Sequence, residues 1–231
     1  MVSARKVVAP SSPGVTQPAI VATVAVLVGL VLRAVTLGTS TPSIPALVDA
    51  GAKVDELVAR GEWWRVVSAG MLHASVAHLL LNCVMLGFAT FAWVWLVRDE
   101  GWSRAVLALT LVVLTSALAF VTSFVAHAGA SVGASGAANG MLAAIVAGVW
   151  VRRQALPTNL HKSGPLALTV AFVVVLAFSW TMGGADHAAH LGGAIAGAVL
   201  GYLVDAWPRT RGVFVGVAVA LVVSATVAAL R

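Results

Sequence analysis

Apolar residues in this chain gather in seven long blocks, and the polar and charged residues lie mainly in the segments between them. Most blocks approach the length of about 20 residues that an α-helix needs to cross a hydrocarbon core of about 30 Å. This pattern predicts an all-α protein with several membrane spans. The predicted spans are residues 19–37, 77–96, 105–125, 135–151, 166–180, 188–204 and 213–230, of which the fifth is short.

The composition supports a membrane protein and narrows its partners. Hydrophobic residues make up 60% of the chain and charged residues only 10%, whereas about a quarter of the residues in a soluble domain are charged. The net charge is +6, but the basic residues are scattered over short loops. Without a basic stripe, nucleic-acid binding is not expected. The single cysteine, Cys83, lies in an apolar block and excludes an internal disulfide.

One long loop, residues 38–76, interrupts the succession of spans. Pro42 and Pro45 stand near its start, and the charged run from Asp49 to Arg65 is compatible with a short helix. The other connections are short, which favours a single domain. The basic N-terminus precedes a Pro/Ser stretch and a full-length span, so the first block is interpreted as a transmembrane helix and not as a secretory signal.

The distribution of Lys and Arg over alternate loops predicts the orientation. By the positive-inside rule the N-terminus is cytoplasmic. The long loop and the segments before the fourth and sixth spans then face outward, as does the C-terminus. The basic residues on the cytoplasmic side are Arg5, Lys6, Arg98, Arg104, Arg152, Arg153, Lys162, Arg209 and Arg211, against Lys53, Arg60, Arg65 and Arg231 on the other side.

Ser135 opens the fourth span within the sequence Gly133-Ala134-Ser135-Gly136. Serine is a preferred N-cap, so one interpretation is that it only caps a helix. The flanking glycines suggest another interpretation. Gly133 and Gly136 remove side chains on both sides, which lets a substrate backbone approach and leaves backbone N–H groups free for a developing negative charge. Ser135 is therefore a candidate nucleophile.

Two histidines, His187 and His190, open the sixth span. Small residues recur at four-residue spacing below His190 and along the fourth span, and such stripes let two helices approach closely in lipid. If the stripes face each other, Ser135 and His190 lie at the same depth, as a serine nucleophile and its general base require. We prefer His190 as the base because it directly heads its stripe. The stripes are Gly193, Gly197 and Gly201 in the sixth span and Gly136, Gly140, Ala144 and Gly148 in the fourth.

Polar residues also stand at the outer end of the second span. His78 and Asn82 are four residues apart and share one helical face. They are interpreted either as interhelical hydrogen-bonding residues or, with the backbone N–H of Ser135, as donors to a tetrahedral oxyanion. His73 lies further out and is expected to pack within the loop.

Other intramembrane chemistries lack their residues. No pair of carboxylates falls within a span, which excludes an intramembrane aspartyl protease. No His-Glu-x-x-His run occurs, and the outer histidines have no carboxylate or thiolate among them, so no metal site is expected. Internal repeats of the kind that many transporters carry are not found, which makes a transporter less expected.

Taken in order, these residues resemble the rhomboid intramembrane proteases. The resemblance extends over about residues 60–205, and it depends on the order and spacing of the motifs on successive spans. The motifs are Glu62-Trp63-Trp64-Arg65, then His73, His78 and Asn82, then Gly133-Ala134-Ser135-Gly136, then Ala189-His190-Leu191-Gly192-Gly193.

The resemblance implies a rhomboid-like six-helix catalytic core followed by a seventh, C-terminal transmembrane helix. It implies a dyad of Ser135 and His190 without an acid, and an oxyanion site made by His78 and Asn82. It also implies that the outer loop with the Trp-Arg motif faces lipid. Finally, it implies no cofactor and the cleavage of single-span membrane proteins near the outer surface.

The chain departs from the family pattern at Asn139. Four residues after the serine, many rhomboids carry an aromatic residue on which the catalytic histidine stacks. Either Asn139 holds His190 by a hydrogen bond, or the imidazole ring is oriented otherwise. The candidate supporting residues are Gly133, Gly136, Asn139, His73 and His187.

The sequence thus predicts an intramembrane serine endopeptidase whose partners are transmembrane substrates and the lipid bilayer. It is expected in a bacterial cytoplasmic membrane, with the active site opening to the outer face. The predicted division is a cytoplasmic tail (1–18), the catalytic membrane domain (19–204), and a cytoplasmic loop with the additional helix (205–231). Two alternatives are a non-proteolytic rhomboid-like protein that binds transmembrane helices, and a small transporter. Intact Ser135 and His190 argue against the former.

Overall fold

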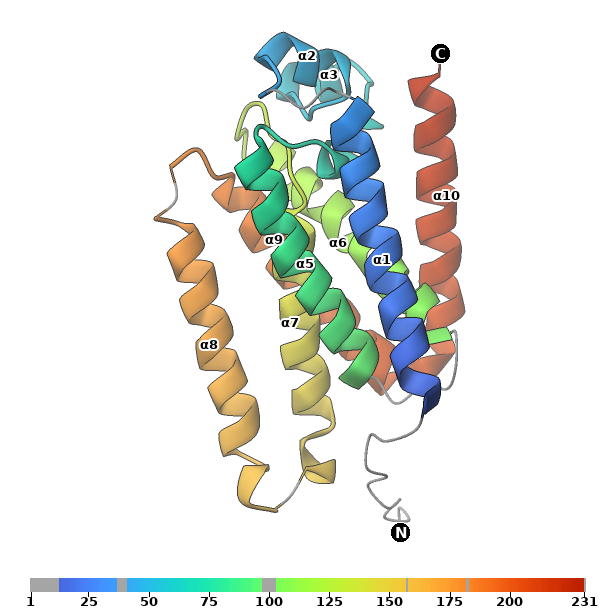
Figure 1. Cartoon of the computed structure of the whole chain (residues 1–231), viewed down its shortest axis with the longest axis vertical. Helices are drawn as coiled ribbons and strands as arrows, with labels where there is room; N and C mark the ends of the chain where they lie inside the picture. The colour runs from blue at the N-terminus through green and yellow to red at the C-terminus, as the bar shows by residue number, and fades with distance from the viewer. Residues whose placement is uncertain (1–12, 37–40, 97–102, 157, 182, 231) are drawn as a thin grey trace.

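The computed structural model describes residues 13–36, 41–96, 103–156, 158–181 and 183–230 (Figure 1). In these ranges the chain forms α-helices joined by short 3₁₀ turns and loops. The α-helices are, in chain order, α1 (Pro13–Thr36), α2 (Ile44–Asp49), α3 (Asp55–Ala59), α4 (Arg65–Ser68), α5 (Val76–Leu96), α6 (Ser103–Val125), α7 (Ser135–Val151), α8 (Ser163–Ser179), α9 (His187–Ala206) and α10 (Arg211–Ala229).

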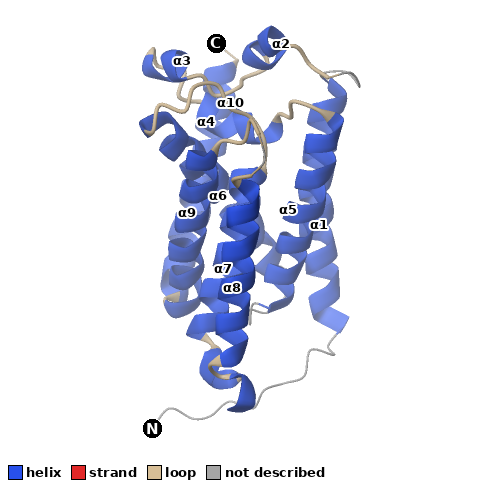
Figure 2. Cartoon of the chain, turned by 90° about the vertical axis from the view of Figure 1, so that its left-hand side faces the viewer, coloured by secondary structure: helices blue, strands red, loops and turns tan. Residues whose placement is uncertain are grey.

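The long helices form one bundle in which α7 is central (Figures 1 and 2). Helix α7 packs against α5, α6, α8 and α9, and its contact with α9 is the most extensive in the bundle. Helix α1 lies against α5 and α6, while α10 lies against α6 and α4. Helix α8 contacts mainly α7 and stands at the left edge in Figure 1. The two helices that begin with candidate catalytic residues, α7 and α9, are therefore the most tightly joined pair.

Each predicted span coincides with one of these helices. In the described part of the chain, five helices are long and apolar enough to cross a membrane, namely α1, α5, α6, α9 and α10, and α7 and α8 are shorter apolar helices. Helix α1 begins at Pro13, earlier than the predicted start at residue 19. The other helix ends differ from the predicted ends by a few residues or less. The predicted all-α fold with several membrane spans is confirmed.

The core of the bundle is apolar and is filled from α5, α6 and α7. Leu86, Trp93, Leu111 and Met141 are each 1% exposed or less. The hydroxyl of the buried Thr115 donates to the carbonyl of Leu111 in its own helix, which is how threonine is accommodated where no water is present. The middle of the bundle is therefore held mainly by close packing.

Residues 41–75 fold over one end of the bundle, which we call the loop end (top in Figure 1). Arg65 holds this segment together from inside, since it is only 6% exposed. Its guanidinium forms an ion pair with Glu62 at 2.7 Å, donates to the carbonyl of Val48 at 2.5 Å and lies 4.7 Å from the ring centroid of Trp64. The Trp-Arg motif, expected in a lipid-facing loop, thus supplies an internal tie between α2 and α4.

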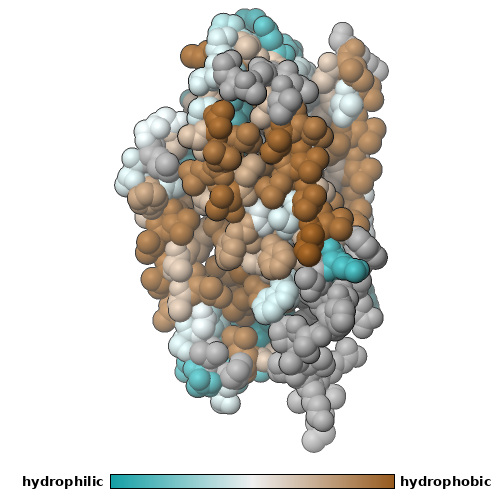
Figure 3. Space-filling model, viewed as in Figure 1, coloured by the Kyte–Doolittle hydropathy of each residue, from teal (hydrophilic) through white to brown (hydrophobic). Residues whose placement is uncertain are grey.

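The outer surface of the bundle is largely hydrophobic along its middle (Figure 3). Large apolar side chains such as Phe88 of α5, Phe178 of α8 and Val213 of α10 are highly exposed. Hydrophilic residues gather mainly toward the two ends of the visible face. Apolar surface of this extent is unfavourable in water and is expected where lipid covers it. The protein is accordingly an integral membrane protein.

Candidate active site

Helices α7 and α9 meet glycine to glycine. A Cβ atom built on Gly193 or Gly197 would collide with the backbone carbonyl of the facing residue of α7, so only glycine allows the two backbones this close. Because both helices begin at the loop end, this contact brings their first turns to the same level. The facing pairs are Gly193 with Gly136, Gly197 with Gly140, and Gly201 with Ala144.

Ser135 and His190 form a hydrogen bond at the loop end of this contact. Ser135 is the first residue of α7, and His190 lies in the first turn of α9. The distance between Ser135 Oγ and His190 Nε2 is 2.8 Å, which is normal for a hydrogen bond from a hydroxyl to an imidazole nitrogen. His190 is 6% exposed, and Ser135 is half-buried. A serine and a histidine in this relation can act as nucleophile and general base.

The hydroxyl of Ser135 does not cap its helix. The N-cap of α7 is Ala134, and this helix start has no side-chain cap hydrogen bond. The capping interpretation of Ser135 is therefore wrong, because the chain turns into the helix one residue earlier and the hydroxyl points to His190 instead. As the first helical residue, Ser135 also carries a backbone N–H that has no acceptor within the helix.

The second ring nitrogen of His190 faces a residue that the sequence did not single out. Ser179, the last residue of α8, has its Oγ 3.2 Å from His190 Nδ1. The same Oγ lies 2.6 Å from the carbonyl oxygen of Leu176. A single serine at the end of an apolar span carries no recognisable pattern, and only the packing of α8 beside α9 brings it to the histidine.

Asp186 fixes the start of α9 beside the dyad. It is the N-cap of the helix, and its carboxylate accepts the backbone N–H of Ala189 at 2.9 Å. Its other carboxylate oxygen accepts a short hydrogen bond from Ser123 of α6. The acid nearest in sequence to His190 therefore anchors α9 to α6.

His78 and Asn82 lie beside the loop that leads into Ser135. A Cβ atom on Gly133 would lie 2.6 Å from the ring of His78 and 3.4 Å from Nδ2 of Asn82. Gly133 also has a φ of +121°, so this position requires glycine both for its backbone and for the approach of His78. Asn82 is 1% exposed, and its Nδ2 has no hydrogen-bond partner among the described residues. A buried, unpaired donor thus lies beside the loop that leads into the candidate nucleophile.

The two remaining histidines have different environments. His73 lies in the loop before α5, 5% exposed, with its ring centroid 5.1 Å from that of His78. Burial lowers the pKa of His73 to about 4, and the neighbouring His78 acts in the same direction. His187 is exposed, with its ring 5.5 Å from Trp180 and 6.4 Å from His190. Of the two histidines in α9, the one in contact with Ser135 is His190.

Asn139 and Gly136 serve packing inside the bundle. Asn139 is 1% exposed, and its amide donates to the backbone carbonyl of Ser135 at 3.0 Å. The side-chain amide of Asn139 therefore bonds to Ser135 and not to His190. The imidazole ring of His190 is held by other residues. A Cβ atom on Gly136 would lie 2.5 Å from Cβ of Ala119 in α6. The space beside Gly136 is therefore filled by helix packing, which differs from the predicted role of admitting a substrate.

A polar latch joins the loop segment 41–75 to the loop before α7. Lys53 is fully buried and pairs with Asp55 at 2.5 Å, while its ammonium group donates to the carbonyl of Gly129 at 2.8 Å. Asp55 accepts the backbone N–H of Gly129 at 2.7 Å. Lys53 and Ser131 exchange two backbone hydrogen bonds as an isolated β-bridge. The segment that carries Ser135 is thereby fixed from outside the bundle.

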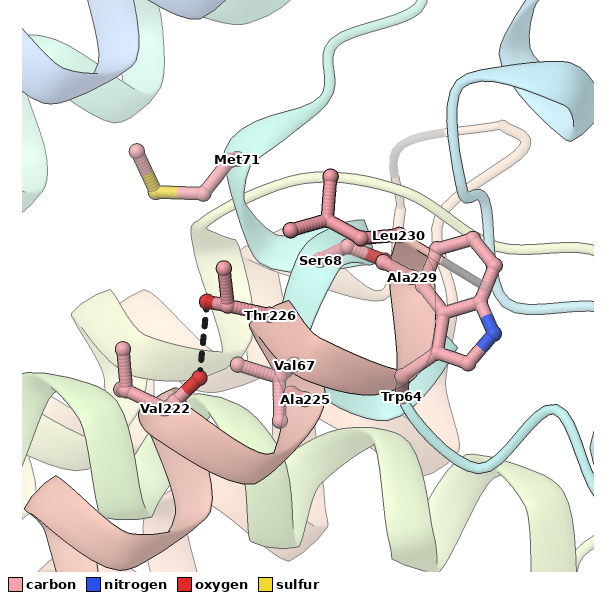
Figure 4. A pocket seen from close by; sticks show the side chains of 9 residues that line it. All are labelled: Trp64, Val67, Ser68, Met71, Val222, Ala225, Thr226, Ala229 and Leu230. Atoms are coloured by element: carbon pink, nitrogen blue, oxygen red, sulfur yellow. Dashed lines mark hydrogen bonds between the residues drawn. The ribbon is translucent and has the colours of Figure 1, made fainter.

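A cavity of about 250 Å³ lies between the loop segment and α10 (Figure 4). Its walls are mainly apolar, and none of the candidate catalytic side chains lines it. It is therefore separate from the site around Ser135. The lining residues are Trp64, Val67, Ser68, Met71, Val222, Ala225, Thr226, Ala229 and Leu230.

Comparison with known proteins gives a consistent result. Residues 60–207 match the Rhomboid domain family, and this range contains every candidate site residue named above. The rhomboid protease GluP of Bacillus subtilis (strain 168) is 28% identical over 152 residues. The RHOMBOID-like protein 5 of Arabidopsis thaliana is 30% identical over 172 residues.

Both relatives are longer than the region that they share with this chain. The match to the Bacillus protein covers 65% of this chain and 28% of that protein. The match to the Arabidopsis protein covers 73% of this chain and 52% of that protein. The chain therefore spans only part of the length of these relatives.

Proposed function

Because the chain belongs to the rhomboid family, we propose that it is an intramembrane serine endopeptidase that cleaves single-span membrane proteins near the outer face of the membrane. The observation that carries the proposal is the 2.8 Å hydrogen bond between Ser135 Oγ and His190 Nε2. The protein is proposed to lie in a bacterial cytoplasmic membrane with its N-terminus in the cytoplasm, following the distribution of basic residues.

In the first half of the reaction, Ser135 attacks the carbonyl carbon of the scissile peptide bond. As the bond from Oγ to carbon forms, the hydroxyl proton passes to Nε2 of His190. The carbonyl oxygen becomes an oxyanion. When this intermediate collapses, the carbon–nitrogen bond breaks, the proton on Nε2 passes to the leaving amine, and an acyl-enzyme remains on Ser135.

The oxyanion is proposed to be bound by His78, Asn82 and the backbone N–H of Ser135. The unpaired Nδ2 of Asn82 supports this role, since a buried donor without an acceptor is already in place for a charge that develops only during the reaction. His78 lies beside the same glycine as Asn82, Gly133. Removal of one such donor typically lowers kcat by about 10²-fold or more.

In the second half of the reaction, water replaces the amine. His190 accepts a proton from water as its oxygen attacks the acyl carbon, and the proton returns to Oγ of Ser135 when the ester bond breaks. Water must therefore reach a site below the membrane surface. We propose that the polar side chains of His73, His78 and Asn82 line this path from the loop end to the half-buried Ser135. No cofactor takes part in these steps.

Two alternatives make different predictions for the same protein. A non-proteolytic rhomboid-like protein would bind transmembrane helices without forming a covalent intermediate, and a small transporter would move a solute. Only the protease forms an acyl-type adduct on Ser135. Labelling by a serine-reactive phosphonate therefore distinguishes the protease from both alternatives.

The decisive experiment uses the purified full chain in liposomes with a panel of single-span membrane substrates. We expect cleavage and phosphonate labelling in the wild type, and neither in Ser135→Ala or His190→Ala. His187→Ala is the matched control, because it removes the second imidazole of α9 and should keep most of the activity. Undiminished proteolysis in folded Ser135→Ala would refute the assignment, and the reverse pattern in the two histidine variants would move the base one turn outward.

A further inference from the structure

The end of α8 touches the base of the proposed dyad, so this inference rests on the proposed function. Helix α8 is exposed along most of its length, and the residues buried in it are Pro165 and Ser179. Ser179 is 9% exposed and lies 3.2 Å from His190 Nδ1 through its hydroxyl oxygen. A polar side chain is thus buried at the one point where α8 reaches the histidine.

The hydrogen-bond geometry of Ser179 determines which group is the donor. Its hydroxyl has a single proton, and its oxygen lies 2.6 Å from the carbonyl oxygen of Leu176. A carbonyl oxygen can only accept, so this contact uses the hydroxyl proton. The 3.2 Å contact with Nδ1 of His190 must then be donated by the ring, from Nδ1–H to the hydroxyl oxygen. A neutral imidazole with its proton on Nδ1 has a free lone pair on Nε2.

The nearby carboxylate does not take this role. Both oxygens of Asp186 are engaged, one with the N–H of Ala189 and the other with the hydroxyl of Ser123. In serine protease triads a carboxylate accepts from Nδ1–H and selects the tautomer. Here Nδ1 of His190 contacts a neutral hydroxyl instead.

We propose that Ser179 is a positioning residue that holds His190 in the Nδ1–H tautomer, with Nε2 directed at Ser135. Without it, the ring can place its proton on Nε2, where it cannot accept the proton of Ser135. The imidazolium that forms during the reaction keeps its Nδ1–H and continues to donate to Ser179. Since the hydroxyl is neutral, it stabilises this cation less than a carboxylate would.

The first test reads the tautomer directly and needs no variant. Wild-type protein with isotopically labelled histidine in liposomes is examined by solid-state NMR at about pH 8, where an ordinary imidazole is neutral. His190→Ala identifies the His190 signals by subtraction. We expect a protonated Nδ1 and an unprotonated Nε2, and a protonated Nε2 in the wild type would overturn the proposal.

The second test compares variants at the same end of α8. Ser179→Ala should lower kcat by about 10- to 100-fold, because a buried N–H loses its acceptor and the tautomers mix. KM should change little, and Ser179→Thr, which keeps the hydroxyl, should recover most of the kcat. The matched control is Thr181→Ala, whose hydroxyl donates to the carbonyl of Phe178 at 2.7 Å but is exposed. It should leave both kcat and the NMR signals unchanged.

The two readouts keep this proposal distinct from the proposed function. If the wild type neither cleaves nor reacts with a phosphonate, the protease assignment fails, while the ring-nitrogen signals still decide the role of Ser179. Wild-type tautomer and kcat in Ser179→Ala would overturn the positioning role. So would equal losses in the Ser179→Ala and Thr181→Ala variants that follow a fall in melting temperature.

Discussion

At the scale of single residues, the group that contacts Nδ1 of the candidate base, His190, is the hydroxyl of Ser179. A buried carboxylate would carry a desolvation cost of several kcal/mol unless it were fully paired, and the carboxylate of Asp186 is already used to anchor α9. The Ser179 hydroxyl orients the imidazole of His190 without adding a charge at membrane depth. The consequence is a base that is well oriented, but whose imidazolium form is stabilised less than it would be by a carboxylate.

The unpaired amide of Asn82 leads to a prediction that separates activity from stability. Asn82→Ala should lower kcat by about 10²-fold if Nδ2 binds the oxyanion. Its melting temperature should change little, because the structure gives Nδ2 no hydrogen bond to lose among the described residues. Both quantities are measured on the same purified preparation.

The matched control for Asn82 is Thr90→Val in the same helix. Thr90 is also fully buried, and its hydroxyl has no partner among the described residues, but it lies two turns away from the site. It should keep the wild-type kcat. If Asn82→Ala turned over substrate at a near-normal rate, the oxyanion role would be excluded, and a fall in activity that only follows unfolding would indicate helix packing instead.

His73 predicts a dependence of stability on pH. Burial lowers its pKa from 6.5 to about 4 in the folded protein, so between these values the unfolded chain binds more protons at this position than the folded chain. Stability should therefore be full above about pH 6.5 and fall as the pH falls toward about 4, with a total effect of about 3 kcal/mol. Unfolding curves of the wild type and His73→Phe, recorded across this range, should diverge at the acid end.

The control for the pH effect is His127→Gln, because His127 is exposed. Its curve should run parallel to that of the wild type. Parallel curves for His73→Phe as well would show that the folded protein does not resist the protonation of His73.

At the scale of elements, the contact of α7 with α9 depends on the absence of side chains. A methyl group at Gly197 would overlap the backbone of Gly140, so Gly197→Ala should destabilise the protein by about 2 kcal/mol or more. Gly216 in α10 has nothing within 4 Å of a built Cβ atom. Gly216→Ala should raise stability by about 0.5–1 kcal/mol through helix propensity.

Thermal unfolding of the two alanine variants in the same detergent tests this contrast. Opposite shifts in melting temperature are expected. Similar shifts would mean that the two helices can separate to admit a methyl group, and the close contact would not be required for folding.

The latch between the two loops leads to a further prediction at this scale. Lys53→Met leaves the carboxylate of Asp55 without its cation and removes the bond to the carbonyl of Gly129. Loss of one partner of a buried pair typically costs about 3–5 kcal/mol, and the loop before Ser135 should lose its fixed position. We expect a lower melting temperature and a lower kcat.

Arg60→Met is the matched control for the latch, since Arg60 is an exposed cation of the same segment. It should leave both the melting temperature and kcat near their wild-type values. Equal effects of the two substitutions would show that the net charge of the segment, and not the latch, is responsible.

At the scale of the whole molecule, the features that can be predicted from the sequence are those that hydrophobic periodicity and composition determine. The apolar blocks gave the helices, and the start of α7 at Ser135 follows from the glycine-rich segment before it. The four-residue spacing of small residues predicted a contact that the structure contains. These features are local or repetitive, so they can be recognised without a partner.

The residues that were missed act through long-range contacts. Ser179 lies at the end of an exposed apolar helix, and its role depends on where α8 packs. In the sequence, Lys53 is indistinguishable from a solvated lysine of a polar loop. In the structure it is fully buried. The interpretation of Ser135 as an N-cap was wrong for a similar reason, because the competing partner, His190, comes from another helix.

Polar contacts hold the bundle at both of its ends. At the loop end, Asp186 of α9 accepts a hydrogen bond from Ser123 of α6. At the opposite end, Asp205 of α9 pairs with Arg152, which follows α7, at 3.1 Å. Between them, α9 contacts its neighbours mainly through small and apolar residues.

The glycine stripes, taken alone, are degenerate in register. Because the pattern repeats every four residues, α9 could slide by one turn, about 5.4 Å, and still present only small residues to α7. His190 would then lie one turn away from Ser135, and both the hydrogen bond between Asp186 and Ser123 and the ion pair between Asp205 and Arg152 would be broken. The facing pairs in the shifted register would be Ala189 with Gly136, Gly193 with Gly140, Gly197 with Ala144, and Gly201 with Gly148. Two carboxylates that take no part in the chemistry therefore help to select the working register.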